Sequence, residues 1–137
     1  MIRSLARLWP LLLILAVISA SAKESSGPLI YSDVRLEEGE AELVGTELEL
    51  KIDGSAATGV VKIYQGGCAE HVLVTGSASG NTIHVSGEGQ GFGRIEITGT
   101  LQNGHIGQGP HLDGWLRLER NHTSEKIHLK KIAKPHC

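Results

Sequence analysis

The chain has 137 residues, which is enough for one domain and short for two. Its 13 Lys and Arg against 15 Asp and Glu give a formal net charge of −2 at pH 7. A slightly acidic chain lacks the clustered basic side chains that contacts with phosphates require, so we expect no nucleic-acid partner.

The first 22 residues have the pattern of an export signal. Two arginines precede an apolar run at 8–18, and Ala20 and Ala22 supply the small side chains that signal peptidase needs. The run is shorter than the ~20 residues that span a bilayer. We therefore expect a signal helix at 1–22, cleavage after Ala22, and a secreted or periplasmic protein with no membrane span after signal removal.

Residues 23–30 show little pattern and predict a flexible N-terminal segment, followed by one domain over 31–137. Within that domain, acidic side chains concentrate at 33–53 and basic ones after residue 116. Opposite charges at the two ends favour pairing of the first and last strands across a barrel seam. The alternative is an acidic surface for a cationic partner.

Residues 46–53 alternate as a half-buried strand does, and the glycine-containing stretch after them reverses the chain into a second strand. A change of parity near Val44-Gly45 predicts a turn or a bulge before this strand. The hairpin fits two registers, which differ by two residues. One sets two lysines against each other, and the other sets Asp53 against Lys62, which is better electrostatically.

The segment GEGQGFGR, at 87–94, carries four glycines separated by single residues. A phosphate-binding loop would need a helix after these glycines, but the residues that follow alternate as a strand does. The apolar parity is the same on both sides, so the turn has an odd number of residues. We predict a three-residue loop at 89–91. The predicted pairs are Val85–Ile95 and Ile83–Ile97 on the inner face, and His84–Glu96 and Thr82–Thr98 on the outer face.

Three neighbouring turns obey the same parity rule. Gly80-Asn81 and Asn103-Gly104 fit two-residue hairpin loops, and 121–124 fits a four-residue turn. Each keeps one apolar face turned inward. The corresponding predictions set Val72, Val74, Gly76 and Ala78 against Ile83, Val85 and Gly87, Leu101 against Ile106, Leu118 against Ile127, Leu116 against Leu129, and Glu119 against Lys126.

Four connections that agree with the apolar pattern predict an all-β fold. It is a small antiparallel up-and-down meander of about eight strands that closes into a barrel or rolled sheet, which removes exposed edges. Glycines on the inward face would let the strands bend at the corners of a small barrel. A site where a ligand approaches the backbone closely is the alternative reading of these glycines.

Two cysteines, Cys68 and Cys137, are present. In an exported protein such a pair forms a disulfide. The alternative is a metal-binding protein in which reduced Cys68 and Cys137 join His71 and His136 in a Cys₂His₂ zinc site. Residues three apart on a strand point to opposite faces, which argues against that site, so we predict the disulfide, no metal site and no cofactor.

The irregular segment GPHLDGW, at 109–115, carries polar side chains beside the only tryptophan after the signal. Loops at the mouth of a barrel commonly carry binding residues, and a tryptophan that plugs one barrel end is the structural alternative. The candidate ligand-binding residues are Trp115, His111, Asp113 and Phe92.

No catalytic motif accompanies this pattern, because the chain lacks a nucleophile elbow and a histidine pair with helical metal spacing. The sequence favours an exported, non-enzymatic β-barrel module that binds a small ligand or a protein partner, or has an accessory role in the cell envelope. The alternative is an inhibitor of an extracellular hydrolase that uses a rigid loop at 107–114.

Overall fold

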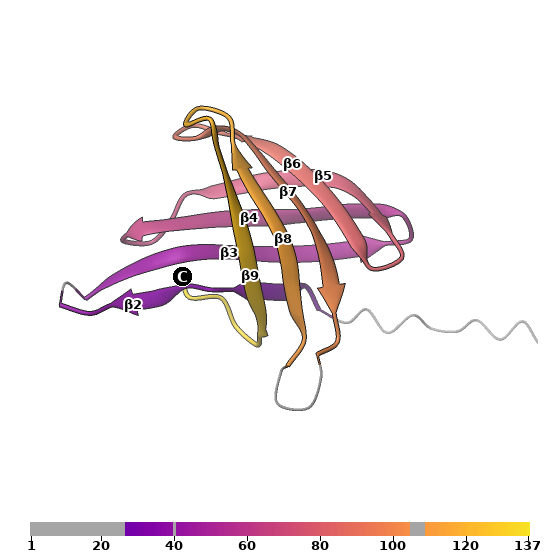
Figure 1. Cartoon of the computed structure of the whole chain (residues 1–137), viewed down its shortest axis with the longest axis horizontal. Coiled ribbons are helices and arrows are strands. Elements are labelled where there is room, and N and C mark those ends of the chain that lie inside the picture. The colour runs from indigo at the N-terminus through magenta and orange to yellow at the C-terminus, as the bar shows by residue number, and fades with distance from the viewer. Residues whose placement is uncertain (1–26, 40, 105–108) are drawn as a thin grey trace, which may run out of the picture.

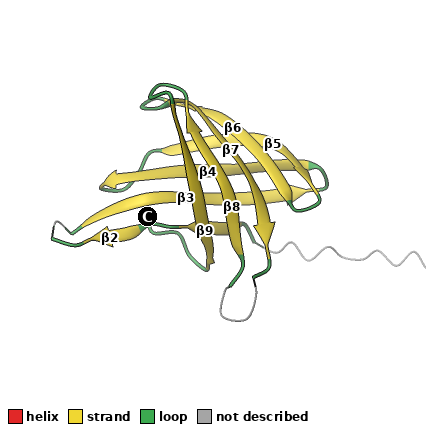
Figure 2. Cartoon of the chain, viewed as in Figure 1, coloured by secondary structure: helices red, strands yellow, loops and turns green. Residues whose placement is uncertain are grey.

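The computed structural model describes residues 27–39, 41–104 and 109–137, and these form strands and connecting loops with no helix (Figures 1 and 2). No helix in that part of the chain is long and apolar enough to cross a membrane. The predicted signal helix at 1–22 and its cleavage after Ala22 lie outside the described residues, and so does Ile106, the predicted partner of Leu101. The strands are β1 (Leu29–Ser32), β2 (Arg35–Glu37), β3 (Glu42–Asp53), β4 (Ala56–Gly66), β5 (His71–Ser79), β6 (Thr82–Gly89), β7 (Gly93–Gln102), β8 (His111–Leu118) and β9 (Thr123–Ile132).

The strands from β3 to β9 pair antiparallel in chain order, and β1 closes the sheet by pairing with both β9 and β3. The result is an eight-stranded up-and-down barrel with β2 as one extra strand along β3. In Figure 1, β8 and β9 cross β3 and β4 at a steep angle, as strands do in a small, strongly coiled barrel. The predicted all-β meander and its closure are confirmed.

The closing strand β1 is only four residues long. Tyr31 is the partner of Leu48 on β3 and of Lys131 on β9. Leu29 and Ile30 belong to this strand, so the barrel includes the last two residues of the segment expected to be flexible. Because the uncharged β1 lies between β3 and β9, the acidic and basic ends of the domain are not direct neighbours, as the seam argument had assumed.

The Gly80-Asn81 turn is confirmed, since Ser79 pairs with Thr82 and Ala78 with Ile83. The glycine-rich turn has the predicted length and inward parity but is displaced by one residue. Gly89 pairs with Gly93, which leaves 90–92 as the loop. Its end is set by Gly93, whose φ of 69° is readily available only to glycine. The predicted pairs are therefore wrong by two residues: Val85 faces Ile97, Ile83 faces Gly99, His84 faces Thr98, Thr82 faces Thr100, and Ile95 faces Gly87.

The turn between β8 and β9 has four residues as predicted, but it spans 119–122 instead of 121–124. The backbone N–H of His122 donates to the carbonyl of Glu119 at 3.1 Å, and Arg120 donates to the carbonyls of Gln90 and Gly91 in the neighbouring turn. These hydrogen bonds hold the turn at 119–122, two residues earlier in the chain than predicted. The predicted pairs give way to Leu118–Thr123, Leu116–Glu125, Gly114–Ile127, Leu112–Leu129 and Trp115–Lys126.

The predicted two-residue turn at Asn103-Gly104 is wrong. Strand β7 ends at Gln102, which pairs with His111, and Leu101 faces Leu112 instead of Ile106. A hairpin at Asn103-Gly104 would have put Pro110, which has no N–H to donate, inside the following strand. Long-range pairing of the fully buried Leu112 therefore overrides the local turn signal.

Both registers considered for the first long hairpin are also wrong. Asp53 pairs with Ala56 across a two-residue turn, and Lys62 faces Glu47. The expectation of an acidic cross-strand partner for Lys62 is correct, but that partner is Glu47, six residues before Asp53. Strand β3 passes through Gly45 without a turn, and the change of parity there coincides with a φ of 129° at that glycine.

The barrel interior is filled by aliphatic side chains. Buried residues from all eight barrel strands meet there, including the fully buried Leu48, Val61, Val85, Ile97 and Leu129. Five inward glycines allow the close strand approach expected at barrel corners, because a Cβ on any of these five would strike a neighbouring strand. The closest approaches are to a backbone carbonyl oxygen: 2.2 Å at Gly59, 1.8 Å at Gly76, 2.0 Å at Gly87, 2.9 Å at Gly99 and 2.1 Å at Gly114.

The substitution Gly76→Ala tests this role. Its Cβ would lie 1.8 Å from the carbonyl oxygen of His84, so the two strands must separate. We expect a loss of about 1–3 kcal/mol or more in the free energy of unfolding, measured by urea denaturation. Gly67→Ala is the matched control, because no atom lies within 4 Å of the added Cβ. Equal stabilities of the two variants would contradict the corner role.

Candidate functional site

The outer face of β7, β8 and β9 carries most of the predicted site residues. Alternation along β8 turns Leu112 and Leu116 into the core and His111, Asp113 and Trp115 outward. The structure thus brings three of the four candidates onto one strand face. Phe92 does not join them, because it lies in the turn after β6 and packs against the core.

Trp115 lies near the middle of this face and is 53% exposed. Thr98 on β7 and Lys126 on β9 are its cross-strand neighbours. The side chain therefore does not plug a barrel end, as the structural alternative had assumed. A large, half-exposed indole on a regular strand is free to contact a partner.

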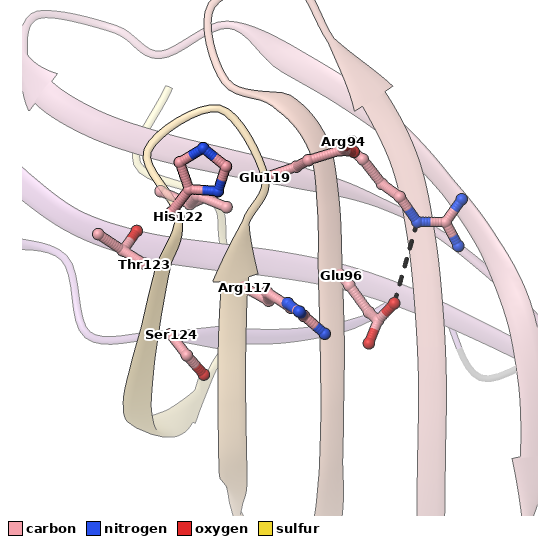
Figure 3. Close-up of a pocket in the computed structure, with 8 residues that line it drawn as sticks. Arg94, Glu96, Arg117, Glu119, His122, Thr123 and Ser124 are labelled. Carbon is pink, nitrogen blue, oxygen red and sulfur yellow. Dashed lines mark ion pairs between the residues drawn. The ribbon is translucent and has the colours of Figure 1, made fainter.

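A charged groove lies on the same face of the sheet, near the turn between β8 and β9 (Figure 3). Arg117 in its lining is two residues after Trp115 on β8. The volume of the groove is about 620 Å³. β7 contributes Arg94 and Glu96, and β8 contributes Arg117. The complete lining is Arg94, Glu96, Arg117, Leu118, Glu119, His122, Thr123 and Ser124.

The charges of the groove are partly paired. Arg94 Nε lies 3.9 Å from Glu96 Oε2, and an Arg94 Nη donates to Ser86 Oγ at 3.2 Å. His84 Nε2 lies 3.5 Å from the other oxygen of Glu96. In register, Arg117 lies between Glu96 and Ser124. The groove therefore offers guanidinium donors next to carboxylate and hydroxyl acceptors, which suits a polar or charged surface better than an apolar ligand.

A second polar group lies at the other end of the same two strands. Asp113 on β8 is the register partner of His128 on β9, and His111 lies two residues before Asp113 on the same face. His111 Nε2 lies 3.2 Å from Asp113 Oδ2, and His128 Nδ1 contacts Asp113 Oδ1. We call these three residues the His–Asp–His cluster.

The hydrogen bond from His128 is the main cause that lowers the pKa of Asp113, and the positive charge of the two histidines acts in the same direction. Asp113 Oδ2 also accepts a hydrogen bond from Gln102 Nε2 at 3.1 Å. The carboxylate of Asp113 is thus an ionised acceptor on which three side chains converge.

The C-terminal tail, residues 133–137, covers the outer face of β3 and β4 (Figure 1). Beneath it lies the tail cluster, which consists of Glu47, Lys62, Tyr64 and His136. Glu47 is 0% exposed, and its carboxylate meets His136 Nδ1 at 2.7 Å, Tyr64 Oη at 3.4 Å and Lys62 Nζ at 3.5 Å. Lys62 also donates to Glu49 Oε1 at 3.1 Å and to the carbonyl of Cys137 at 3.2 Å.

Burial alone would raise the pKa of Glu47, but the hydrogen bonds from His136 and the charge of Lys62 outweigh it and lower that pKa. Burial would likewise lower the pKa of Lys62, but Glu49 and Glu47 raise it. Burial and the charge of Glu47 raise the pKa of Tyr64. The tail cluster therefore holds a buried ion pair with its donors and acceptors satisfied, which makes it a structural element.

The disulfide between Cys68 and Cys137 is present, with a Cα–Cα distance of 5.8 Å, and it ties the tail to the barrel. The thiolates that the Cys₂His₂ alternative needs are therefore bonded to each other. His136 is also engaged with Glu47, so these four residues do not form a metal site. The disulfide fits an oxidising compartment outside the cytoplasm.

Sequence reasoning missed His128 and the tail cluster. Asp113–His128 pairing follows directly from the β8–β9 register, so the two-residue displacement of the turn hid it. Glu47 lies at an outward position of strand β3, where the sequence pattern predicts a solvent-exposed charge. Only the tail, which folds back across 89 residues of sequence, buries it.

No protein-family model, curated protein or solved structure matches this chain.

Replacement of both cysteines by serine tests the disulfide. The bond closes a loop of 69 residues, for which the chain-entropy model gives about 4 kcal/mol. We expect the variant to lose about 2–5 kcal/mol in the free energy of unfolding, measured by denaturation in urea. Reduction of the wild-type protein should have the same effect, and it should leave the stability of the variant unchanged.

The tail cluster predicts an acid-dependent loss of stability. A carboxyl with a lowered folded pKa stabilises the fold above its ordinary pKa of 4.5, and the contribution disappears as the pH falls through the lowered value. We expect Glu47→Gln to cost about 1–3 kcal/mol in the free energy of unfolding at pH 7 and less at pH 3. The comparison with Glu125→Gln, an exposed carboxyl, is the control; identical pH profiles would be the contrary result.

Proposed function

We propose that this protein is an exported, non-enzymatic β-barrel module that binds a protein partner through the outer face of β7, β8 and β9. The observation that carries the proposal is Trp115, a tryptophan 53% exposed near the centre of a regular strand face. Tryptophan and arginine dominate the binding energy of protein interfaces, and they act best when less critical polar contacts surround them.

The surroundings of Trp115 support a protein partner. Arg117, which lines the charged groove, lies two residues after Trp115 on the same face of β8, and the polar residues Thr98 and Lys126 flank the indole on the neighbouring strands. This combination of an aromatic anchor with a polar rim is the anatomy of a non-obligate interface. The aliphatic filling of the barrel argues against a ligand that enters the lumen.

The proposed export rests on two features. The first 22 residues have the composition of a signal sequence. The disulfide between Cys68 and Cys137 is of the kind that persists in oxidising compartments. The tail cluster needs this bond to remain covered, so the folded protein is suited to a secreted or periplasmic location.

The inhibitor hypothesis receives less support. It relied on a rigid loop at 107–114, but His111–Gly114 belong to β8 and lie flat in the sheet. An inhibitor that inserts into an active site needs a projecting segment. We therefore favour a flat binding surface over an inserted loop.

Site-specific photo-crosslinking in the producing cells tests the proposal. A benzophenone side chain at Lys126 would lie next to Trp115. Leu73 is the matched control position, because it is 75% exposed on the outer face of β5. We expect position 126 to give one cross-linked protein, which is lost on Trp115→Ala, and position 73 to give none.

With that partner purified, Trp115→Ala should weaken binding by at least about 2 kcal/mol, or roughly 30-fold, in titration calorimetry. Because the side chain is half-exposed, the thermal unfolding of the variant should stay close to that of the wild type. Cross-linking that does not depend on Trp115, or that arises equally from position 73, would place the interface elsewhere.

A further inference from the structure

We propose that the His–Asp–His cluster is a binding site for a divalent transition-metal ion of the Zn²⁺ class, held by His111, Asp113 and His128 on the outer face of the barrel. The inference goes beyond the proposed protein-binding function, because it concerns a different group of side chains and a different ligand.

The backbone places the three ligands in one small volume. Register pairing of Asp113 with His128 and the two-residue spacing of His111 from Asp113 turn all three toward the same side of the sheet. One ligand atom of each residue lies within 4.8 Å of the others. Ligand atoms at 2.0–2.1 Å from a tetrahedral zinc are about 3.3 Å apart. The 3.2 Å between His111 Nε2 and Asp113 Oδ2 already matches that separation.

The tautomer of His111 is set by its second contact. Its Nδ1 lies 3.0 Å from the carbonyl oxygen of Gly109, which can only accept, so Nδ1 carries a proton. Nε2 is therefore the nitrogen of His111 that faces Asp113 Oδ2, at 3.2 Å, and it is the one that can bind a metal ion. A backbone carbonyl that orients the remote nitrogen is the usual second contact of a metal-binding histidine.

His111 is also only 5% exposed, although it lies on the outer face. Its ring is thus held in place before a ligand arrives, which reduces the ordering cost of binding. Gln102 acts on Asp113 in the same way, because its side-chain amide donates to Oδ2 at 3.1 Å. The site therefore has two orienting contacts, one from a backbone carbonyl and one from a neighbouring strand.

The competing reading is a simple ion pair in which protons fill the site. The rings of His111 and His128 have their centroids 4.7 Å apart with 42° between their planes. A metal ion between the rings can take a nitrogen from each ring and an oxygen of Asp113 together, whereas each proton joins only one nitrogen to one oxygen. Lys130, the register partner of His111, opposes a cation and will limit the affinity.

The ligand chemistry identifies the class of ion. Two imidazoles and one carboxylate suit Zn²⁺, Cu²⁺ and Ni²⁺, whereas Ca²⁺ and Mg²⁺ require mainly oxygen ligands. Three protein ligands leave a fourth position for water, and His128, about half-exposed, keeps that position open to solvent.

Titration calorimetry of the untagged, disulfide-bonded protein with Zn²⁺ tests the site, with native mass spectrometry to count bound ions. We expect one zinc ion per chain and no binding of Ca²⁺. Asp113→Asn and His128→Ala should abolish binding, and Gln102→Ala should weaken it by about 10–100-fold. His84→Ala is the matched control. It also removes a histidine that faces a carboxylate, that of Glu96, but among the described residues this pair belongs to no group of three potential ligands.

Thermal unfolding checks that the variants are folded and gives a second readout. Zinc should raise the midpoint of the wild-type protein and of His84→Ala, and it should leave that of Asp113→Asn unchanged. Absence of zinc binding by the wild-type protein would overturn the proposal in favour of the ion pair. Equal binding by the wild type and Asp113→Asn, or loss of binding in His84→Ala, would overturn the assignment to these residues.

Discussion

The fold depends on one short strand. β1 pairs through four residues with β3 on one side and through three of them with β9 on the other, and without it the sheet would have two open edges. The closure sets the curvature that every other strand must follow. The inward glycines let the strands approach closely enough to meet that curvature, and the aliphatic side chains between them fill the interior. Closure of the sheet, close strand approach at the glycines and a filled interior therefore depend on one another.

The outer surface divides into two unlike halves. Over β3 and β4 the tail covers a buried ion pair, and such a pair is tolerable only while its partners stay in place. Over β7, β8 and β9 no comparable segment covers the sheet among the described residues. Trp115, the charged groove and the His–Asp–His cluster all lie on this open half. The asymmetry explains why recognition is better sought there than inside the barrel.

Much of the fold could be predicted from the sequence, because the alternation of apolar residues survives every turn. Parity identifies the inward face, and the turn at Gly80-Asn81 follows from it directly. Register could not be predicted as well, since a shift by two residues keeps the same face inward. Contacts between turns, such as Arg120 with the loop at 90–92, decide it, and those contacts join distant segments. The same limit applies to the proposed site: the sequence offers His111, Asp113 and Trp115 as candidates, while His128 can be named only once the β8–β9 register is known.

The connection between Cys68 and Cys137 has a consequence for how the protein matures. The strands β5 to β9 all lie between the two sulfurs along the chain, so the covalent bond can form only after these five of the eight barrel strands have been synthesised. With two cysteines in the chain, any wrong bond must join two molecules. Oxidative folding of this protein thus has a single intramolecular product, and dilution, more than enzymatic reshuffling, protects its yield.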